Sequence, residues 1–253
     1  MVPLFSIAIP LYNEEECVER CVTELVDALD AAYPQVYELI LVVNGSQDRT
    51  GEICRQMAQR YGSIRTVGVA HNLGYGGGIL QGLSAAEGEF VGFMCGDGQV
   101  APKDLIGAMR TIENGPYDLV KALRVTRGDG WIRRLNSIAY NTLFRLLFGT
   151  RTRDINAMPK FWRRSVAPAL DLTCTDWFID AEILIKASHR GLRIYEMPID
   201  YLRRAGGRSV VRLSTVLQFL RNALHLIRSG KIRSWKKPVP LPVESNAPLI
   251  GAV

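Results

Sequence analysis

The chain has 253 residues, of which 47% are apolar, and a formal net charge of +6. That length suits one large α/β domain with a small appendage. A chain with this share of apolar residues can bury a core, which excludes a wholly disordered protein. No apolar run reaches the roughly 18 residues of a membrane span, so we expect no integral membrane segment. The five cysteines lack zinc-site spacing and the amino terminus lacks a signal-peptide pattern, which indicates reduced thiols in the cytoplasm.

Charge is unevenly distributed along the chain. Residues 1–50 contain nine acids and two basic residues, whereas residues 121–164 contain eleven basic residues and two acids. We therefore expect an anionic partner to meet the later segment.

Apolar runs alternate with helical patterns over the first half of the chain. The first predicted strand stops at Pro10, and the acids at 14–16 begin the first helix. Further helices follow the turn at 44–50 and the glycine-rich stretch 71–78, and Pro102 opens another. The predicted strands cover 4–10, 39–43, 65–70, 90–94 and 119–123. This alternation predicts an α/β fold with a mainly parallel, doubly wound sheet.

One loop, Phe93-Met94-Cys95-Gly96-Asp97-Gly98-Gln99, follows a buried strand at the place where open α/β sheets bind ligands. Asp97 and Gln99 both offer oxygen and can face the same hard cation or diphosphate. The alternative is a surface β-turn that carries Asp and Gly for backbone reasons alone.

Two later segments, 131–148 and 213–227, have apolar residues at helical spacing among arginines. Such basic amphipathic helices either lie on a membrane surface or pack on the sheet, and periodicity does not separate the two. The tail from Lys236 is rich in proline and small residues and is predicted to be a loose extension.

Seven short motifs occur in series along the chain. They are Ile9-Pro10-Leu11-Tyr12-Asn13-Glu14, Val42-Val43-Asn44-Gly45-Ser46-Gln47-Asp48, Cys95-Gly96-Asp97, Leu123-Arg124-Val125, Arg153-Asp154-Ile155-Asn156-Ala157, Trp177-Phe178-Ile179-Asp180-Ala181-Glu182 and Arg204-Ala205-Gly206-Gly207-Arg208-Ser209-Val210.

In this order the motifs resemble those of the family 2 glycosyltransferases of the GT-A fold, and more narrowly the polyprenyl-phosphate branch that includes dolichol-phosphate mannose synthase and its glucosyl relatives. The resemblance covers roughly Phe5 to Arg212. It implies the nucleotide-diphospho-sugar transferase fold over 1–212, with a donor-binding half at 1–124 and an acceptor-binding half at 125–212. An amphipathic helix at 213–235 and a flexible tail at 236–253 complete the expected organisation.

The resemblance implies a donor nucleotide site made by the first two motifs. Pro10, Tyr12 and Glu14 stand where the family contacts the nucleotide, and a ring with an acid can stack on and hydrogen-bond a base. The family has two acids where this chain has Val43 and Asn44, so base recognition is expected to be weaker. Val42 can contribute only backbone or packing.

The resemblance also implies a divalent cation, Mg²⁺ or Mn²⁺, at the central loop. Cys95-Gly96-Asp97 replaces the family's Asp-x-Asp, so Asp97 with Gln99 would hold the metal and metal dependence is expected to be weaker. Arg204, on a glycine loop, would close over the departing diphosphate.

For the acceptor, the resemblance implies that Arg124, Arg133 and Ser137 hold a lipid phosphate, with Arg124 also able to reach donor phosphate. The alternative is that these arginines only solvate an amphipathic helix. Asp180 or Glu182 would act as base if the acceptor were a hydroxyl, whereas an ionised phosphate needs no proton removed. Asp180 alternatively caps the next helix.

Together these features predict a cytoplasmic, peripheral membrane glycosyltransferase with inversion at the anomeric carbon. Its expected partners are a nucleotide diphosphate sugar, a polyprenyl phosphate and the membrane surface, but no nucleic acid; a partner subunit or homo-oligomer is compatible. One rival is a family 2 enzyme with a soluble hydroxyl acceptor. The other is a degenerate homologue that binds nucleotide or lipid, since acids are replaced at positions 43, 44 and 95 and a lysine at 210.

Overall fold

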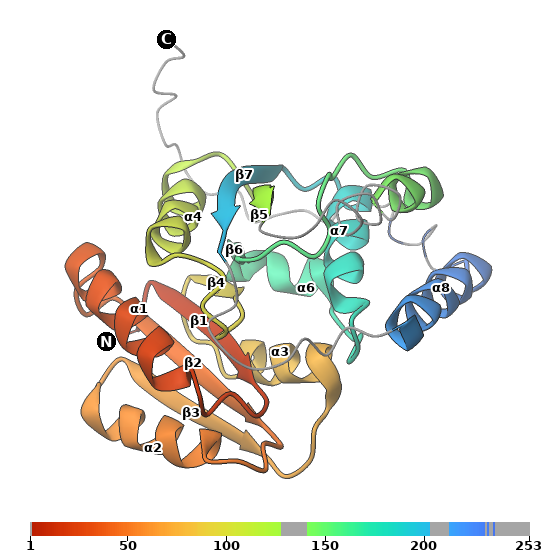
Figure 1. Cartoon of the computed structure of the whole chain (residues 1–253). Coiled ribbons are helices and arrows are strands. Elements are labelled where there is room, and N and C mark those ends of the chain that lie inside the picture. The colour runs from red at the N-terminus through yellow and green to blue at the C-terminus, as the bar shows by residue number, and fades with distance from the viewer. Residues whose placement is uncertain (1, 128–140, 203–212, 231, 233–234, 236–253) are drawn as a thin grey trace.

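The computed structural model describes residues 2–127, 141–202, 213–230, 232 and 235, and its strands form a seven-stranded sheet (Figure 1). The strands are β1 (Phe5–Leu11), β2 (Tyr37–Asn44), β3 (Ile64–Val69), β4 (Phe90–Phe93), β5 (Leu119–Arg127), β6 (Lys160–Arg163) and β7 (Ile194–Tyr201). The helices are α1 (Val18–Ala32), α2 (Thr50–Arg60), α3 (Gly74–Ser84), α4 (Pro102–Asn114), the 3-10 turn η1 (Arg164–Val166), α6 (Ala167–Leu170), α7 (Ile179–His189) and α8 (Leu213–Arg228). Residues 141–148 are helical as well.

The sheet order is β3-β2-β1-β4-β6-β5-β7, and every pairing is parallel except the two made by β6. This confirms the predicted α/β fold with a mainly parallel sheet. The sequence patterns missed β6 and β7. β6 is four residues long with a basic residue at each end, and β7 contains Pro198, which is compatible with its place at the sheet edge.

The predicted end of β1 and start of α1 were wrong. β1 continues through Pro10 to Leu11, because its pairing with β4 ends at Ala8 and Phe93 and no backbone donor is needed there. α1 begins only at Val18, so the acids at 14–16 lie in a turn before the helix. Side chains of the loop after β2 hold that turn, together with backbone hydrogen bonds from Cys17 N and Val18 N to Glu14 O.

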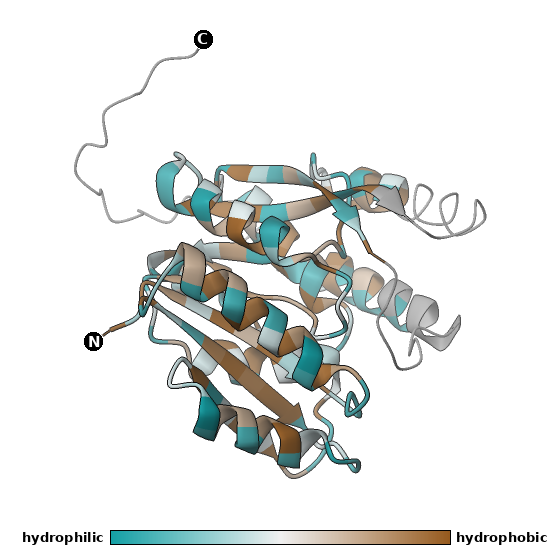
Figure 2. Cartoon of the chain, turned by 60° about the vertical axis from the view of Figure 1, so that its left-hand side comes forward, coloured by the Kyte–Doolittle hydropathy of each residue, from teal (hydrophilic) through white to brown (hydrophobic). Residues whose placement is uncertain are grey.

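Two apolar clusters cover the two faces of the sheet, because side chains alternate along each strand. Ile7 and Ile9 join α1, α2 and α4 in one cluster, whereas Ala8 joins α3 and α7 in the other. Figure 1 shows α1 and α4 on one side of the sheet and α3 and α7 on the other. Figure 2 shows apolar strands between helices with hydrophilic residues on their outer surfaces.

Helix α8 confirms the predicted helix at 213–227, and it packs on the α7 side of the molecule. Its Ala223 and Leu226 are buried with Phe144 and Phe148 from the helical residues 141–148. Each helix also has exposed leucine or isoleucine side chains, so only one side of each helix is buried against the rest of the protein. The earlier part of the predicted 131–148 helix, up to residue 140, lies outside the described residues. Among the residues described, no helix has the length and apolar character needed to cross a membrane.

Candidate functional site

The predicted site lies where strand order reverses, beside β1. The chain leaves β1, β2 and β4 at the same edge of the sheet, because these strands are parallel. β5 ends at this edge and the antiparallel β6 begins there, since Phe93 pairs with Lys160. Open α/β sheets bind ligands at such a reversal. The structure therefore brings the Asp97 loop, Arg124 and Lys160 to one edge.

The loop after β4 is held in a fixed shape. Asp97 is 6% exposed, and its Oδ1 accepts a hydrogen bond from the Gln99 backbone N–H at 3.1 Å. Gly96 packs closely on β1, since a Cβ there would lie 2.5 Å from Leu11 Cδ2 and 3.0 Å from Ile9 Cγ2. Gln99 ties the loop to the end of β7, because its carbonyl accepts from Leu202 N at 2.9 Å and its Nε2 donates to Leu202 O at 3.4 Å. The Asp97–Gln99 bond is the backbone role that the β-turn alternative gives to Asp97, and the metal role of the two residues stays a prediction.

Cys95 and Tyr201 stand beside Asp97. The Cys95 thiol is half-buried, with Sγ 3.7 Å from Met158 Sδ. Burial raises the pKa of Tyr201 well above its ordinary value, and negative charge on Cys95 and Asp97 adds to the rise. The phenol therefore stays protonated and available as a donor near the loop.

Arg124 lies in the later part of β5, which ends at Arg127, and forms a bidentate ion pair with Asp154. Its Nε donates to Asp154 Oδ2 at 2.8 Å and its Nη2 to Oδ1 at 2.7 Å, with side chains only 17% and 5% exposed. The guanidinium also lies 5.1 Å from the centre of the Tyr201 ring. Burial lowers the pKa of Arg124, but the bonds to Asp154 outweigh burial and the pKa is raised overall. Asp154 thus fixes the orientation of the Arg124 guanidinium, and its role in phosphate binding stays a prediction.

Asp180 is 1% exposed and forms a buried ion pair with Lys160, whose Nζ also donates to Ala157 O at 3.0 Å. The suggestion that Asp180 caps α7 is wrong, because Phe178 is the N-cap residue and no side chain caps the helix. Lys160 has no signal in the sequence pattern, since a lysine is ordinarily a surface residue. Only the antiparallel β6 brings it beneath the site.

Glu182 holds the loop before α7. Its carboxylate accepts hydrogen bonds from the backbone N–H groups of Thr173 and Cys174 and pairs with Lys186 at 2.8 Å. Burial raises the pKa of Glu182, but the bonds from Lys186 and the two backbone groups outweigh burial, and the pKa is lowered overall.

The loops after β1 and β2 bind one another. Asn13, at φ 54°, donates from its backbone N–H to Ser46 Oγ at 3.2 Å, and its Oδ1 accepts from Gln47 N at 2.9 Å. The Glu14 backbone N–H donates to Thr50 Oγ1 at 2.8 Å. Tyr12 remains 38% exposed on this rigid platform. The predicted donor residues of β1 and its loop are therefore held together before any ligand arrives.

The remaining donor-site residues face the glycine-rich stretch. Val42 is fully buried, with Cγ2 3.0 Å from the place that a Cβ on Gly82 of α3 would take, so its side chain only packs. Asn44 Nδ2 donates to Gly74 O at 2.9 Å and its Oδ1 accepts from Leu73 N at 3.0 Å. Asn44 thus fixes the turn that begins α3. Pro10 abuts the same helix, 3.1 Å from the Cβ position of Gly78.

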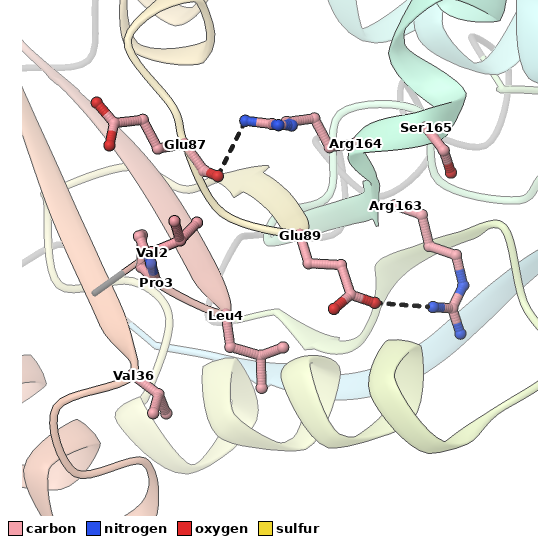
Figure 3. Close-up of a pocket in the computed structure, with 9 residues that line it drawn as sticks. All are labelled: Val2, Pro3, Leu4, Val36, Glu87, Glu89, Arg163, Arg164 and Ser165. Atoms are coloured by element: carbon pink, nitrogen blue, oxygen red, sulfur yellow. Dashed lines mark hydrogen bonds and ion pairs between the residues drawn. The ribbon is translucent and has the colours of Figure 1, made fainter.

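A hollow of about 590 Å³ lies away from this site, at the amino ends of β1 and β4 (Figure 3). Arg164 donates to the carbonyl of Glu87, and Arg163 pairs with Glu89 across it. None of the predicted site residues lines this hollow.

Three predicted site residues, Arg133, Ser137 and Arg204, lie outside the described residues, so their roles stay predictions. Within the parts of the chain that are described, no three His, Cys, Asp or Glu side chains gather as a metal cluster. A cation at this site would therefore rely on few protein ligands.

A buried lysine near the site sets a test of the fold's response to pH. Lys121 is fully buried and donates to Glu196 Oε1 at 3.1 Å and to Ala122 O at 2.8 Å. Burial lowers its pKa from 10.5 to about 8, although the charge of Glu196 opposes the change. Between these two values the unfolded chain binds a proton that the folded chain lacks, so this group makes the free energy of unfolding rise with pH.

We expect that rise to total about 3 kcal/mol for Lys121. Urea unfolding at pH 7.5 and 10 measures it, with Lys121→Met as the comparison because buried cysteines and tyrosines titrate in both proteins. The free energy of unfolding of the wild type, minus that of Lys121→Met, should therefore increase from pH 7.5 to pH 10. A difference that is independent of pH would contradict the assignment.

The comparison with family models identifies the chain. The model described as "Glycosyl transferase family 2" matches residues 6–174, from β1 to the loop before α7. The chain belongs to glycosyl transferase family 2. The family 2 match covers the loops after β1, β2 and β4 and the start of β6.

Two relatives place this family 2 chain more narrowly. It is 30% identical over 235 residues to the undecaprenyl-phosphate 4-deoxy-4-formamido-L-arabinose transferase of Edwardsiella ictaluri, covering 92% of this chain and 70% of the relative. It is 32% identical over 169 residues to the dodecaprenyl-phosphate galacturonate synthase of Rhizobium johnstonii, covering 66% of this chain and 50% of the relative. Both names describe enzymes that place a sugar on a polyprenyl phosphate.

A solved structure confirms the fold of this family 2 chain. Glucosyl-3-phosphoglycerate synthase from Mycobacterium tuberculosis, in complex with Mn²⁺, UDP and phosphoglyceric acid, matches with a TM-score of 0.68 at 20% identity. The match covers 94% of this chain and 80% of the synthase. It confirms the GT-A fold that the motifs predicted.

Proposed function

We propose that this family 2 glycosyltransferase transfers a sugar from a nucleotide diphosphate sugar to a polyprenyl phosphate, with inversion at the anomeric carbon. The donor is of the GDP-mannose or UDP-glucose type. One observation carries the proposal: Asp97, in the loop after β4, and Arg124, in the later part of β5, both lie next to Tyr201 at the same edge of the sheet. An acid and a guanidinium side by side support a site that binds a metal diphosphate and a second phosphate. The names of the two relatives support the acceptor class.

A single divalent cation fits the residues of the loop after β4. Mg²⁺ keeps several waters and commonly needs only one or two protein carboxylates besides substrate phosphates, and Asp97 with the Gln99 amide supplies such a set. Mn²⁺ is the alternative, and it accompanies UDP in the M. tuberculosis synthase. Held by Asp97 and Gln99, either ion would supply positive charge that stabilises the departing diphosphate. Gly96 and the Asp97–Gln99 hydrogen bond hold these ligands in place.

The chain's own residues position both substrates. Tyr12 stacks on the donor base, and Pro10 and Glu14 hold the nucleotide. Hydrogen bonds between the loops after β1 and β2 keep these residues in place. Arg124, oriented by Asp154, directs the acceptor phosphate, with Arg133 and Ser137 completing that site and Arg204 covering the diphosphate.

The acceptor needs no general base, because an ionised phosphate oxygen is already nucleophilic. The burial of Asp180 against Lys160 supports this acceptor over a hydroxyl, since a base must reach the proton that it removes. In the lipid-phosphate enzyme Asp180 is a charge partner of Lys160 that shapes the floor of the site.

The acceptor is lipid-bound, so the enzyme acts as a peripheral protein at the cytoplasmic membrane surface. Two adjacent helices supply the contact. The exposed apolar side chains there are Leu143, Leu146, Leu147, Leu224 and Ile227. Arg145, Arg221 and Arg228 are exposed on the same helices and suit anionic headgroups.

Transfer in detergent tests the proposed function. The full chain is incubated with undecaprenyl or dolichyl phosphate, Mg²⁺ or Mn²⁺, and a panel of labelled nucleotide sugars. We expect labelled polyprenyl-phosphate sugar with one donor class, and a rate that falls on chelation of the metal. A folded chain that neither binds nor transfers any donor in the panel would overturn the proposal, whereas transfer only to a soluble hydroxyl would favour the rival acceptor.

A further inference from the structure

Helix α8 is joined to the loop before α7 through one carboxylate. Asp176 Oδ2 accepts hydrogen bonds from Gln218 Nε2 at 2.9 Å and from Asn222 Nδ2 at 2.6 Å, while its Oδ1 accepts from Phe178 N at 2.8 Å. Gln218 and Asn222 are four residues apart and lie on the same side of α8. One acid thereby connects the start of α7 with α8.

The 173–177 loop, defined as those five residues, is seated directly on the glycine-rich start of α3. Gly77 N donates to Thr175 O at 2.9 Å. A Cβ at Gly76 would lie 2.4 Å from Cys174 O and 2.7 Å from Asp176 O, so only glycine permits this approach.

An aromatic stack extends the connection toward the site. The rings of Tyr75 and Trp177 lie 4.2 Å apart and 10° from parallel. The Tyr75 hydroxyl lies 3.2 Å from Met158 Sδ, which in turn lies 3.7 Å from Cys95 Sγ. Contacts thus run without a break from α8 to the loop that carries Asp97.

A second attachment lies beyond the end of α8. Lys186 Nζ lies 5.1 Å from the ring centre of Trp235, and Lys186 pairs with Glu182, the carboxylate that holds the backbone of Thr173 and Cys174. Helix α8 contacts the 173–177 loop directly through Asp176, and Trp235 contacts it indirectly through Lys186 and Glu182.

We propose that Asp176, Gln218 and Asn222 are positioning residues for the acceptor. They fix the 173–177 loop, and with it the Tyr75–Trp177 stack, as a formed wall that reaches Met158 and the Cys95 thiol beside Asp97. Because α8 also carries the exposed Leu224 and Ile227, a lipid surface that binds these two side chains contacts the helix that supports the wall. A wall formed in advance lowers the entropy cost of binding the lipid phosphate. The inference rests on the proposed transfer to polyprenyl phosphate.

The double variant Gln218→Ala/Asn222→Ala tests this inference in the full chain. It removes both donors from α8 while leaving Asp176 and its bond to Phe178. We expect the KM for polyprenyl phosphate to rise about tenfold, with kcat and the donor-induced thermal shift within about twofold of wild type. Asn222→Gln, which keeps a donor amide, should recover much of the loss. The matched control is Gln56→Ala, whose side chain donates to Glu52 on the exposed surface of α2.

A merely structural role would lower the amount of active enzyme without changing the acceptor KM, and an unchanged KM overturns the inference. Hydrogen exchange at 173–178 gives a second readout that needs no turnover. We expect faster exchange there in the double variant than in Gln56→Ala. If the wild type transfers no sugar, the proposed function fails, and the exchange result then decides the coupling alone: unchanged exchange overturns it.

Discussion

Asp97→Asn is expected to lower sugar transfer by about 10²–10³-fold and to remove its stimulation by Mg²⁺ or Mn²⁺. The asparagine keeps the oxygen that accepts the Gln99 N–H bond at 3.1 Å, so the loop keeps its shape. It loses the charge that attracts a cation to the departing diphosphate. Initial rates across a metal titration, with donor in excess, measure both effects.

Two further variants sharpen this prediction. Asp27→Asn changes an exposed acid on α1 and should leave the rate within about twofold of wild type. Cys95→Asp adds a carboxylate beside Asp97; a large gain in rate would mean that the thiol weakens the site, and little change would mean a site adapted to one carboxylate. A wild-type rate and metal response in Asp97→Asn would contradict the role of Asp97.

Lys160→Met is expected to lower the free energy of unfolding by about 3–5 kcal/mol, because it leaves Asp180 buried without its cation. Both side chains are almost fully inaccessible, at 0% and 2% exposure. Urea unfolding followed by circular dichroism measures the loss. Lys103→Met on α4 is the matched control, since this lysine is exposed and its replacement should change stability by less than about 0.5 kcal/mol.

The double variant Lys160→Met/Asp180→Leu separates the pair from the cost of a lone charge. Replacing both partners by apolar residues is expected to restore most of the stability. If transfer to polyprenyl phosphate survives in this double variant, Asp180 is not a base. A single variant as stable as the wild type would contradict the buried pair.

The donor half of the fold was predictable because its signals are local. Each strand from β1 to β4 is an apolar run followed by a helical pattern, and parallel pairing follows from that alternation. The predicted end of β1 and start of α1 were wrong because contacts with residues distant in the sequence set both boundaries. Pro10 stays in its strand because β4 no longer pairs there, and α1 begins late because Ser46 and Thr50 hold the turn that precedes it.

The site divides in the same way. Apolar runs placed Asp97, Arg124 and Asn44 after predicted strands, and the structure brings the later parts of these strands and the loop after β4 to one edge of the sheet. The sequence held no signal that Asn44 fixes the Leu73–Gly74 turn, that Asp154 grips Arg124, or that Lys160 is buried against Asp180.

By itself the sequence determined the family, the mainly parallel sheet and the positions along the chain that carry oxygen and guanidinium groups, because these follow from local pattern and motif order. Only the tertiary structure decided which charges are paired. Pairing depends on segments such as β6 and the 173–177 loop, whose neighbours lie tens of residues away in sequence. Burial then makes each pairing decisive, because a charge removed from water is stable only beside its partner.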